Sequence, residues 1–389
     1  MNNSVIYGSR KAFNAVVTHL RAENRDINSL LKEPALFGGR DAIQRSIYSS
    51  RQPIFDYLMD LVDEGLLGLD FVSDLGITAL HAAAMQKTNM HYLNALLHRG
   101  SDPYTRSKDG SPPFLNALKF TNLKGARILF NSPLCDNHRL FYEPNAKGFT
   151  LFGSLIGMAL TNYRNRIDAE IVDFVYRLGP ISFMNHPAMR STVLHLAAKV
   201  WPSSRPDYAN FEAWLAEWLI DRMPAGLINL HDEDGMAALH WMAFTVDDHG
   251  VSTMLQSDKT DPNILTRPNS KNIPVGMTIF DIALDRCTQS LPTRVLEGGA
   301  RELHFYQQRM QRLMALLLKT DIPAPMHADA SRETLAESAL RSLDTSISFA
   351  LLARASAPGR TQGTRAAPWP QVITRSEGDM GFGSLSLDG

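Results

Sequence analysis

Three histidines recur in one local pattern and are the first candidates for chemistry. His81, His195 and His240 each end a short run of small or apolar residues, namely Thr78-Ala79-Leu80, Thr192-Val193-Leu194 and Ala237-Ala238-Leu239. Imidazole is the commonest metal ligand among side chains and a frequent general base. The three rings occupy the same place in separate repeats, however. We therefore expect them to lie at least one repeat spacing apart, which is too far to share one metal.

Two other groups invite a chemical interpretation. The acidic turn His231-Asp232-Glu233-Asp234 could attract a cation, but it lacks the further oxygen ligands that a calcium loop spaces along the chain. Cys135, Asp136 and His138 are adjacent in sequence, whereas catalytic partners must converge in space. The motifs of zinc proteases, phosphate-binding loops, paired-cysteine sites and serine hydrolases are all missing. We expect no catalytic residue, no metal site and no cofactor.

The histidine pattern belongs to a longer repeat. Weaker copies begin near Gly110, Gly148 and Gly276, and a degenerate copy includes Asp41-Ala42-Ile43-Gln44. We call the four-residue pattern the signature slot. Its large apolar residue falls at positions 43, 80, 114, 152, 194, 239 and 280, which are 34 to 45 residues apart. Self-similarity at such a period is the mark of a stacked-repeat protein.

The pattern resembles the ankyrin repeat, whose unit of about 33 residues carries a Thr-Pro-Leu-His-x-Ala signature. The turn Gly100-Ser101-Asp102-Pro103 fits the resemblance, which covers roughly residues 40 to 320. It implies an all-α solenoid of about seven irregular helix-pair repeats with helical caps. It also implies that the slot Thr caps the first helix and the slot His bonds the backbone of a neighbouring turn. Where Gln44, Leu115, Gly153 or Asp281 replaces the His, we expect that bond to be lost.

Apolar periodicity predicts individual helices. In the second repeat we expect helices over 79–86 and 90–98, with one apolar face formed by Met90, Leu93, Leu96 and Leu97. A longer helix is expected over 301–319, with Arg309 and Arg312 off its apolar face, and a shorter one over 332–343. Length excess at 199–209 and 286–299 predicts inserted loops.

We divide the chain into four parts. Residues 1–39 are expected to form an N-terminal helical cap, 40–320 the ankyrin-repeat solenoid, 321–356 a C-terminal helical extension and 357–389 a disordered tail. The tail is rich in Gly, Ser, Thr, Pro and Arg, so it cannot bury enough apolar surface to offset ordering entropy.

Composition excludes several functions. The chain has 389 residues and a formal net charge of −1, which does not favour nucleic-acid binding. It has two cysteines, so a disulfide framework is not expected and a reducing compartment is favoured. Neither a secretory signal nor an apolar run of 18 residues is present, which argues against a membrane protein. We expect a cytoplasmic monomer, with nuclear or translocated locations left open.

The function that we predict is protein–protein recognition by a scaffold or adaptor, and not catalysis. By resemblance, the partner contacts the concave face through variable positions near the first helices. Carried over slot by slot, these are Ile77, Met85, Lys108, Asp109, Lys119, Phe120, Lys147, Phe149, Glu233, Asp234, Met236 and Phe244. Two alternatives remain: an enzyme or enzyme accessory with a site in the long insertions of the fourth and sixth repeats, and an effector translocated into a host cell.

Overall fold

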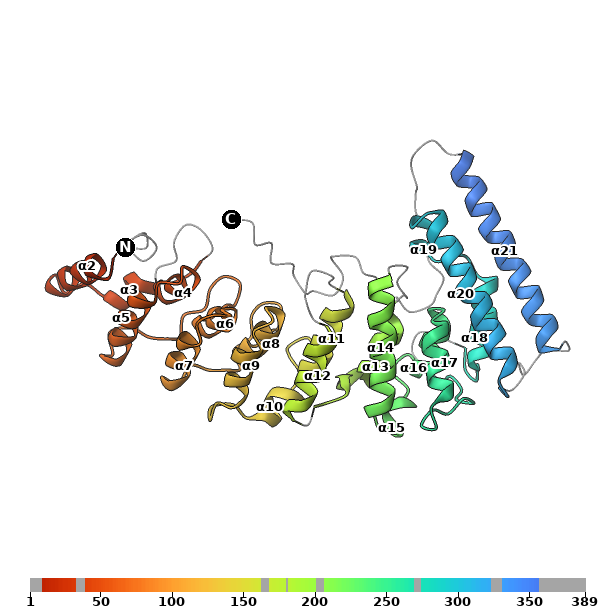
Figure 1. Cartoon of the computed structure of the whole chain (residues 1–389), viewed down its shortest axis with the longest axis horizontal. Coiled ribbons are helices and arrows are strands. Elements are labelled where there is room, and N and C mark those ends of the chain that lie inside the picture. The colour runs from red at the N-terminus through yellow and green to blue at the C-terminus, as the bar shows by residue number, and fades with distance from the viewer. Residues whose placement is uncertain are drawn as a thin grey trace. The chain divides into compact units, whose positions relative to one another are not determined.

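The computed structural model describes residues 9–32, 39–161, 168–179, 181–200, 206–268, 274–322 and 331–356. Their regular secondary structure is almost entirely helical, which confirms the predicted all-α class (Figure 1). The exception is a short antiparallel pair of strands, β1 (Met184–His186) and β2 (Ser191–Thr192). The described chain divides into two compact units. The first holds the described residues of 9–147 and 168–181, and the second those of 148–161 and 182–356.

The first unit is built from helix pairs. Its helices are α2 (Arg10–Ala22), α3 (Ile27–Lys32), α4 (Ala42–Tyr48), α5 (Gln52–Asp63), α6 (Ala79–Ala84), α7 (His91–His98), α8 (Pro113–Lys119), α9 (Leu123–Phe130), α10 (Asn137–Tyr142) and α12 (Ala169–Leu178). The first helices α4, α6 and α8 pack on one another in that order, and α7 packs on α9. At the amino-terminal end, α2 covers α5 with Phe13 and Val17, whose side chains are fully buried.

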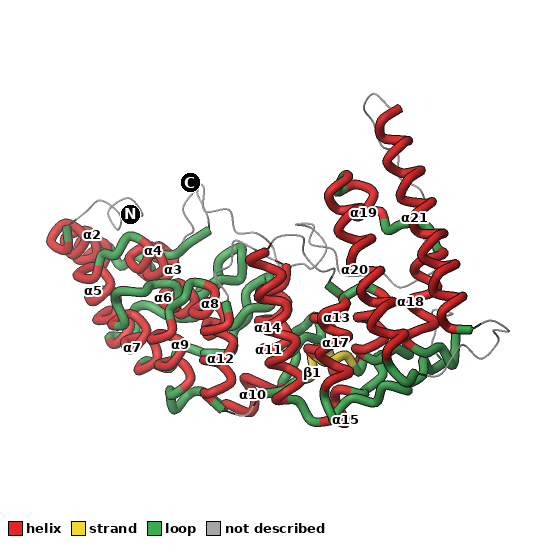
Figure 2. Tube along the Cα trace, turned by 45° about the vertical axis from the view of Figure 1, so that its right-hand side comes forward, coloured by secondary structure: helices red, strands yellow, loops and turns green. Residues whose placement is uncertain are grey.

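The second unit, taken by itself, is also built from two layers of helices. Besides β1 and β2 it contains α11 (Leu151–Thr161), the short 3-10 helix η1 (Pro187–Met189), α13 (Val193–Lys199), α14 (Pro206–Arg222), α15 (Ala225–Ile228), α16 (Ala238–Phe244), α17 (Asp248–Gln256), α18 (Ile279–Thr288), α19 (Thr293–Glu297), α20 (Ala300–Lys319) and α21 (Arg332–Ser356). First helices α11, α13, α16 and α18 form one layer, and α14, α17 and α20 form the other. Helix α21 packs on α18 and α20 and covers the end of this stack (Figure 2).

The large residue of every signature slot lies in a first helix and is buried. Ile43, Leu80, Phe114, Phe152, Leu194, Leu239 and Phe280 are all at most 2% exposed. The residues around them are small where neighbouring helices approach closely, as at the fully buried Ala82, Ala83 and Ala84. The repeat register that the sequence predicts is therefore the register of the structure.

A hairpin turn precedes several of the first helices. Ser73 N–H donates to Ile77 O at 2.9 Å, and Asp232 N–H donates to Met236 O at 3.0 Å. Within each unit, neighbouring hairpins are joined by backbone bonds: Lys108 N–H donates to Leu75 O at 3.0 Å in the first unit, and Arg267 N–H donates to Gly235 O at 2.8 Å in the second. These bonds hold the turn tips in a defined order.

The slot histidines bridge successive repeats, as the resemblance implies. His81 Nε2 donates to Ser111 O at 3.0 Å, while its Nδ1 accepts from Thr78 N–H at 3.2 Å. His195 bonds Met236 O at 3.2 Å and His240 bonds Ile264 O at 3.0 Å in the same way. Both ring nitrogens are thus used by backbone groups, which leaves neither for a metal.

One expectation about the slot is wrong for the first repeat. Gln44 does not lose the bridging bond, because its side-chain amide donates to Ile77 O at 2.8 Å. Asp281 keeps the capping half of the pattern: its carboxylate accepts from Thr278 N–H at 2.7 Å. A long polar side chain at this position can reach the next turn without being an imidazole.

Several predicted bounds need correction. The helix expected over 301–319 is α20, but the one expected over 332–343 continues to Ser356 as α21. Arg309 of α20 is buried, not turned away from the core. Part of the insertion at 199–209 lies outside the described residues, and helix α14 already begins at Pro206; the insertion at 286–299 includes α19. The expected tail over 357–389 lies outside the described residues.

Candidate partner-binding face

In the first unit, the predicted contact residues lie at hairpin tips and at the ends of first helices. Met85 follows α6 and is half-buried; its sulfur accepts a weak hydrogen bond from the Tyr48 hydroxyl at 3.6 Å. Phe120 follows α8 and is also half-buried. Lys108 and Lys147 are exposed. The face therefore offers apolar groups at the helix ends and cationic groups at the tips.

Asp109 and Lys119 have a mainly structural role. The Lys119 ammonium forms an ion pair with the Asp109 carboxylate and donates to Ser111 Oγ at 2.8 Å, with both side chains about 15% exposed or less. Burial opposes ionisation of Asp109, but the Lys119 charge and the hydrogen bonds from Lys119, Ser107 and Ser111 together outweigh it and lower the pKa of Asp109 to about 2. The pair closes the hairpin onto the end of α8.

In the second unit, the predicted residues divide between surface and interior. Glu233 is exposed at a hairpin tip, and its N–H donates to Met189 O at 3.0 Å. Phe149 is half-buried and meets the ring of His186 edge-on, with the ring centres 5.2 Å apart. Both remain accessible to a partner.

Four of the predicted contact residues are buried: Ile77, Asp234, Met236 and Phe244 are 6%, 2%, 0% and 4% exposed. They are covered by neighbouring parts of the chain. Lys199 lies 3.4 Å from Asp234, and the Arg286 guanidinium covers the Phe244 ring at 4.7 Å. In the structure these four side chains pack in the interior, so we no longer include them in the candidate face.

Lys199 organises a polar cluster that the slot pattern does not reveal. Its ammonium lies 2.8 Å from Asp232 Oδ2 and 4.4 Å from the centre of the Trp241 ring. The Trp241 indole N–H donates to the same Asp232 carboxylate at 2.9 Å. Burial would raise the pKa of Asp232, but the nearby Lys199 charge holds it below its ordinary value. Asp232 and Asp234 of the acidic turn are thus paired with Lys199 inside the protein.

Exposed apolar residues in and beside the hairpins add to the candidate face. Leu75 of the first unit is 46% exposed, and Met189, Leu265 and Val275 of the second are 41%, 41% and 61% exposed. Exposed apolar side chains that gather on one surface are typical of interaction sites. Met189, Leu265 and Val275 escaped the slot-by-slot prediction because they lie in irregular hairpins. Val275 could have been predicted from the sequence, because it is an apolar residue directly before a turn glycine, Gly276.

The other chemical candidates resolve into structural roles. Asp136 caps α10, accepting from His138 N–H at 2.9 Å, and the His138 ring stacks on Tyr142 with centres 4.8 Å apart. Burial raises the pKa of Cys135, which disfavours a reactive thiolate. Within the described ranges, no group of three or more His, Cys, Asp or Glu side chains could hold a metal ion. The helices described include none long and apolar enough to cross a membrane.

Comparison with known proteins agrees with this geometry. The family model of the ankyrin repeat matches residues 75–108, which contain Thr78 and His81, so this segment is an ankyrin repeat and the predicted resemblance is confirmed. A similar solved structure is the ankyrin repeat domain of Bcl-3, described as a unique member of the IkappaB protein family. It shares 17% identity with a TM-score of 0.46 and covers 63% of this chain and 94% of that one. No curated protein matches the chain.

Proposed function

We propose that the chain is a protein–protein interaction module that binds its partner through the hairpin tips and the ends of the first helices. Ankyrin repeats support the general role, since stacked repeats present extended surfaces for binding. The observation that carries the specific proposal is the set of accessible apolar side chains at these positions. Met85, Phe120 and Leu75 offer it in the first unit, and Phe149, Met189 and Val275 in the second.

The backbone supports a preorganised surface. The bond from Lys108 N–H to Leu75 O ties two tips of the first unit together, and the bond from Glu233 N–H to Met189 O does so in the second. A surface whose backbone is already ordered loses less conformational entropy when a partner binds. Apolar anchors with charged neighbours such as Lys108 and Glu233 match the composition of interface centres and rims.

The enzyme alternative draws no support from a cavity beside the described part of the fourth insertion. This cavity of about 180 Å³ is lined in part by Asp247, His249 and Arg309. Arg309 is already paired with Asp247 at 2.6 Å, and His249 lies 3.4 Å from Glu217. Asp247, His249 and Arg309 are thus each engaged in an ion pair or a close contact with an acidic group. The proposal therefore assigns no catalytic activity, and it includes a scaffold or adaptor role in the cytoplasm.

Affinity purification with quantitative mass spectrometry tests the proposal. The test variant carries Met85→Ala and Phe120→Ala, and a second variant carries Lys108→Glu. The matched controls are Leu66→Ala, a surface leucine 36% exposed, and Lys11→Glu, an exposed charge on α2. We expect the test variants to lose the same partner by tenfold or more while melting within a few degrees of the parent chain. Equal recovery by test and control variants would refute the assigned face.

A further inference from the structure

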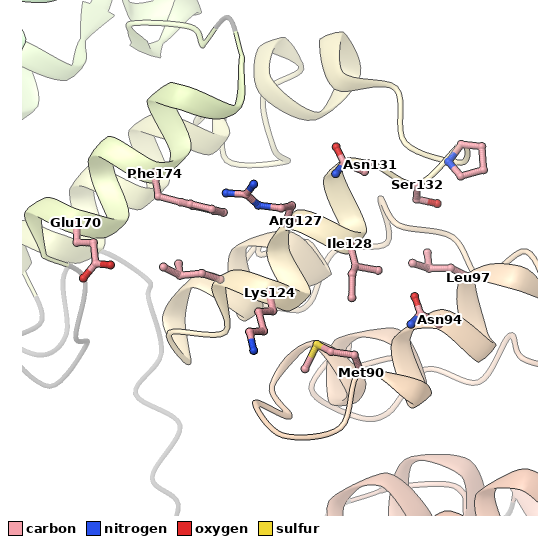
Figure 3. A pocket seen from close by; sticks show the side chains of 12 residues that line it. Met90, Asn94, Leu97, Lys124, Arg127, Ile128, Asn131, Ser132, Glu170 and Phe174 are labelled. Atoms are coloured by element: carbon pink, nitrogen blue, oxygen red, sulfur yellow. The ribbon is translucent and has the colours of Figure 1, made fainter.

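A long groove runs over the second helices of the first unit, away from the hairpin tips. Its main part has a volume of about 880 Å³ and lies among α7, α9 and α12. A second hollow of about 390 Å³ continues it between α9 and α12 and shares Leu123, Arg127 and Phe174 with the first. Figure 3 shows the Arg127 and Phe174 side chains extending toward each other from the two helices, and the Arg127 guanidinium lies 5.6 Å from the Phe174 ring centre.

The floor and the rim of the groove have different chemistry. Met90, Leu97, Leu123, Ile128 and Phe174 supply apolar surface, and all but Leu97 are half-buried. Asn94 and Asn131 are exposed at the rim, where their amides can form hydrogen bonds. Lining of this kind, mostly apolar with a few polar groups, is typical of ligand and peptide sites.

The charges of the rim are unbalanced along α9. Lys124 and Arg127 are exposed, are three residues apart and therefore share a helix face. Neither forms an ion pair within the part of the chain that the structure describes. Arg177, by contrast, is paired with Asp173. Glu170 lies in the first turn of α12, where the helix dipole already stabilises a carboxylate. The groove therefore presents two cations that lack acidic partners beside an apolar floor.

We propose that this groove binds an acidic amphipathic helix of a protein partner. Its walls are helix faces without a free strand edge, which disfavours an extended peptide and favours the helix-in-groove mode. Apolar residues at spacings of three and four would contact Leu97, Ile128 and Phe174, and carboxylates beside them would meet Lys124 and Arg127. The site is distinct from the hairpin-tip face, so it does not depend on the function proposed above.

The test uses the full chain and a defined probe. The probe is a fluorescent, side-chain-cross-linked helical peptide of about 15 residues, since shorter or unconstrained helices are marginal in water. It carries leucines on one face and glutamates on the flanks. Its twin has lysines in place of the glutamates. Anisotropy titration at low salt should show the acidic peptide binding at least about tenfold more tightly, with the preference shrinking as salt rises.

Charge reversal in the protein makes the assignment specific. The variant Lys124→Glu with Arg127→Glu changes only exposed side chains, and a melting curve checks its fold. It should prefer the basic twin. The control Lys11→Glu removes an exposed cation on α2, outside both proposed sites, and should leave the preference for the acidic peptide intact. The proposal is overturned if neither peptide binds at about 1 mM, if both bind alike, or if the reversed variant keeps the original preference.

Discussion

The side-chain amide of Gln44 donates to the carbonyl oxygen of Ile77 at 2.8 Å and so joins the first helix of one repeat to the turn of the next. His81 makes the equivalent bond to Ser111 one repeat later, at 3.0 Å. Two chemically different side chains thus do the same work in one position. The position requires a side-chain donor long enough to reach the carbonyl oxygen of the next repeat. That oxygen is buried away from water and therefore needs a hydrogen-bond partner within the protein.

Two substitutions at Gln44 test whether the hydrogen bond, and not the glutamine side chain as such, stabilises the fold. Gln44→Ala should lower the free energy of unfolding by about 1–2 kcal/mol through the lost bond and side chain. Gln44→His should retain most of that stability at pH 8, because an imidazole can reach the same carbonyl. Urea denaturation at pH 8 measures both. If Gln44→Ala and Gln44→His lower the free energy of unfolding equally, the bridging hydrogen bond does not account for the stability that Gln44 provides.

The three slot histidines should make stability depend on pH. Burial lowers the pKa of His81, His195 and His240 to about 4, against 6.5 for an unperturbed ring. The unfolded chain therefore takes up protons before the folded chain does, so stability is complete above pH 6.5 and falls as the pH drops toward 4. The loss is up to about 3 kcal/mol per ring.

Urea denaturation between pH 8 and pH 4.5 measures this dependence, and His81→Gln should reduce its slope between pH 6.5 and 4.5. The control Leu80→Ala destabilises the same helix without removing an ionisable group and should leave the slope unchanged. If the slope is the same in both variants, His81 does not contribute to the pH dependence of stability.

Two glycines in corresponding hairpin positions should differ sharply in tolerance. Gly235 has φ of +70°, and a Cβ there would lie 2.2 Å from Arg267 O; Gly276 has φ of +81° with open space around it. Gly276→Ala should cost about 1–2 kcal/mol from backbone strain alone. Gly235→Ala should cost more than about 3 kcal/mol, because it also displaces the neighbouring hairpin. Chemical denaturation of both variants tests this ranking, and equal costs would contradict the close approach.

Arg309 should be far more important than the neighbouring Arg312. The Arg309 guanidinium donates to Val246 O at 3.0 Å and pairs with Asp247 at 2.6 Å and Asp248 at 2.7 Å, although its side chain is only 10% exposed. Arg309→Ala leaves two carboxylates without this partner and should cost about 3–5 kcal/mol. Arg312, 56% exposed, also pairs with Asp248, and Arg312→Ala should cost less than about 1 kcal/mol. Thermal melts of both variants decide the matter; similar melting temperatures would mean that the buried network is not stabilising.

Burial reassigns Met236 from the surface to the core. Met236 and Leu239 are 0% and 1% exposed, whereas Glu233 in the same hairpin is exposed. Met236→Ala and Leu239→Ala should each cost about 2–5 kcal/mol, and Glu233→Ala less than about 0.5 kcal/mol. Denaturation curves of the three variants check the assignment. A Met236→Ala chain as stable as Glu233→Ala would return Met236 to the candidate partner surface.

The sequence by itself determined where the first helices lie. A cap such as Thr78, a large residue such as Leu80 and the small residues after it act within one helical turn, so their pattern reads directly as local structure. The apolar stripe of α20 was equally legible: Leu303, Met310 and Leu317 are all fully buried. Such local signals are strong because capping and periodicity depend on neighbours only three or four residues away.

Only the tertiary structure decided which variable positions remain accessible. Asp234 and Phe244 occupy slots that face a partner in the family, yet Lys199 and Arg286 cover them here. The groove beside Lys124 and Arg127 likewise depends on α12, which lies some 40 residues further along the chain. Exposure depends on which other segment of the chain packs over a position, as Lys199 does over Asp234 and Arg286 over Phe244. The sequence pattern of one repeat does not indicate which distant segment of the chain will pack over its variable positions.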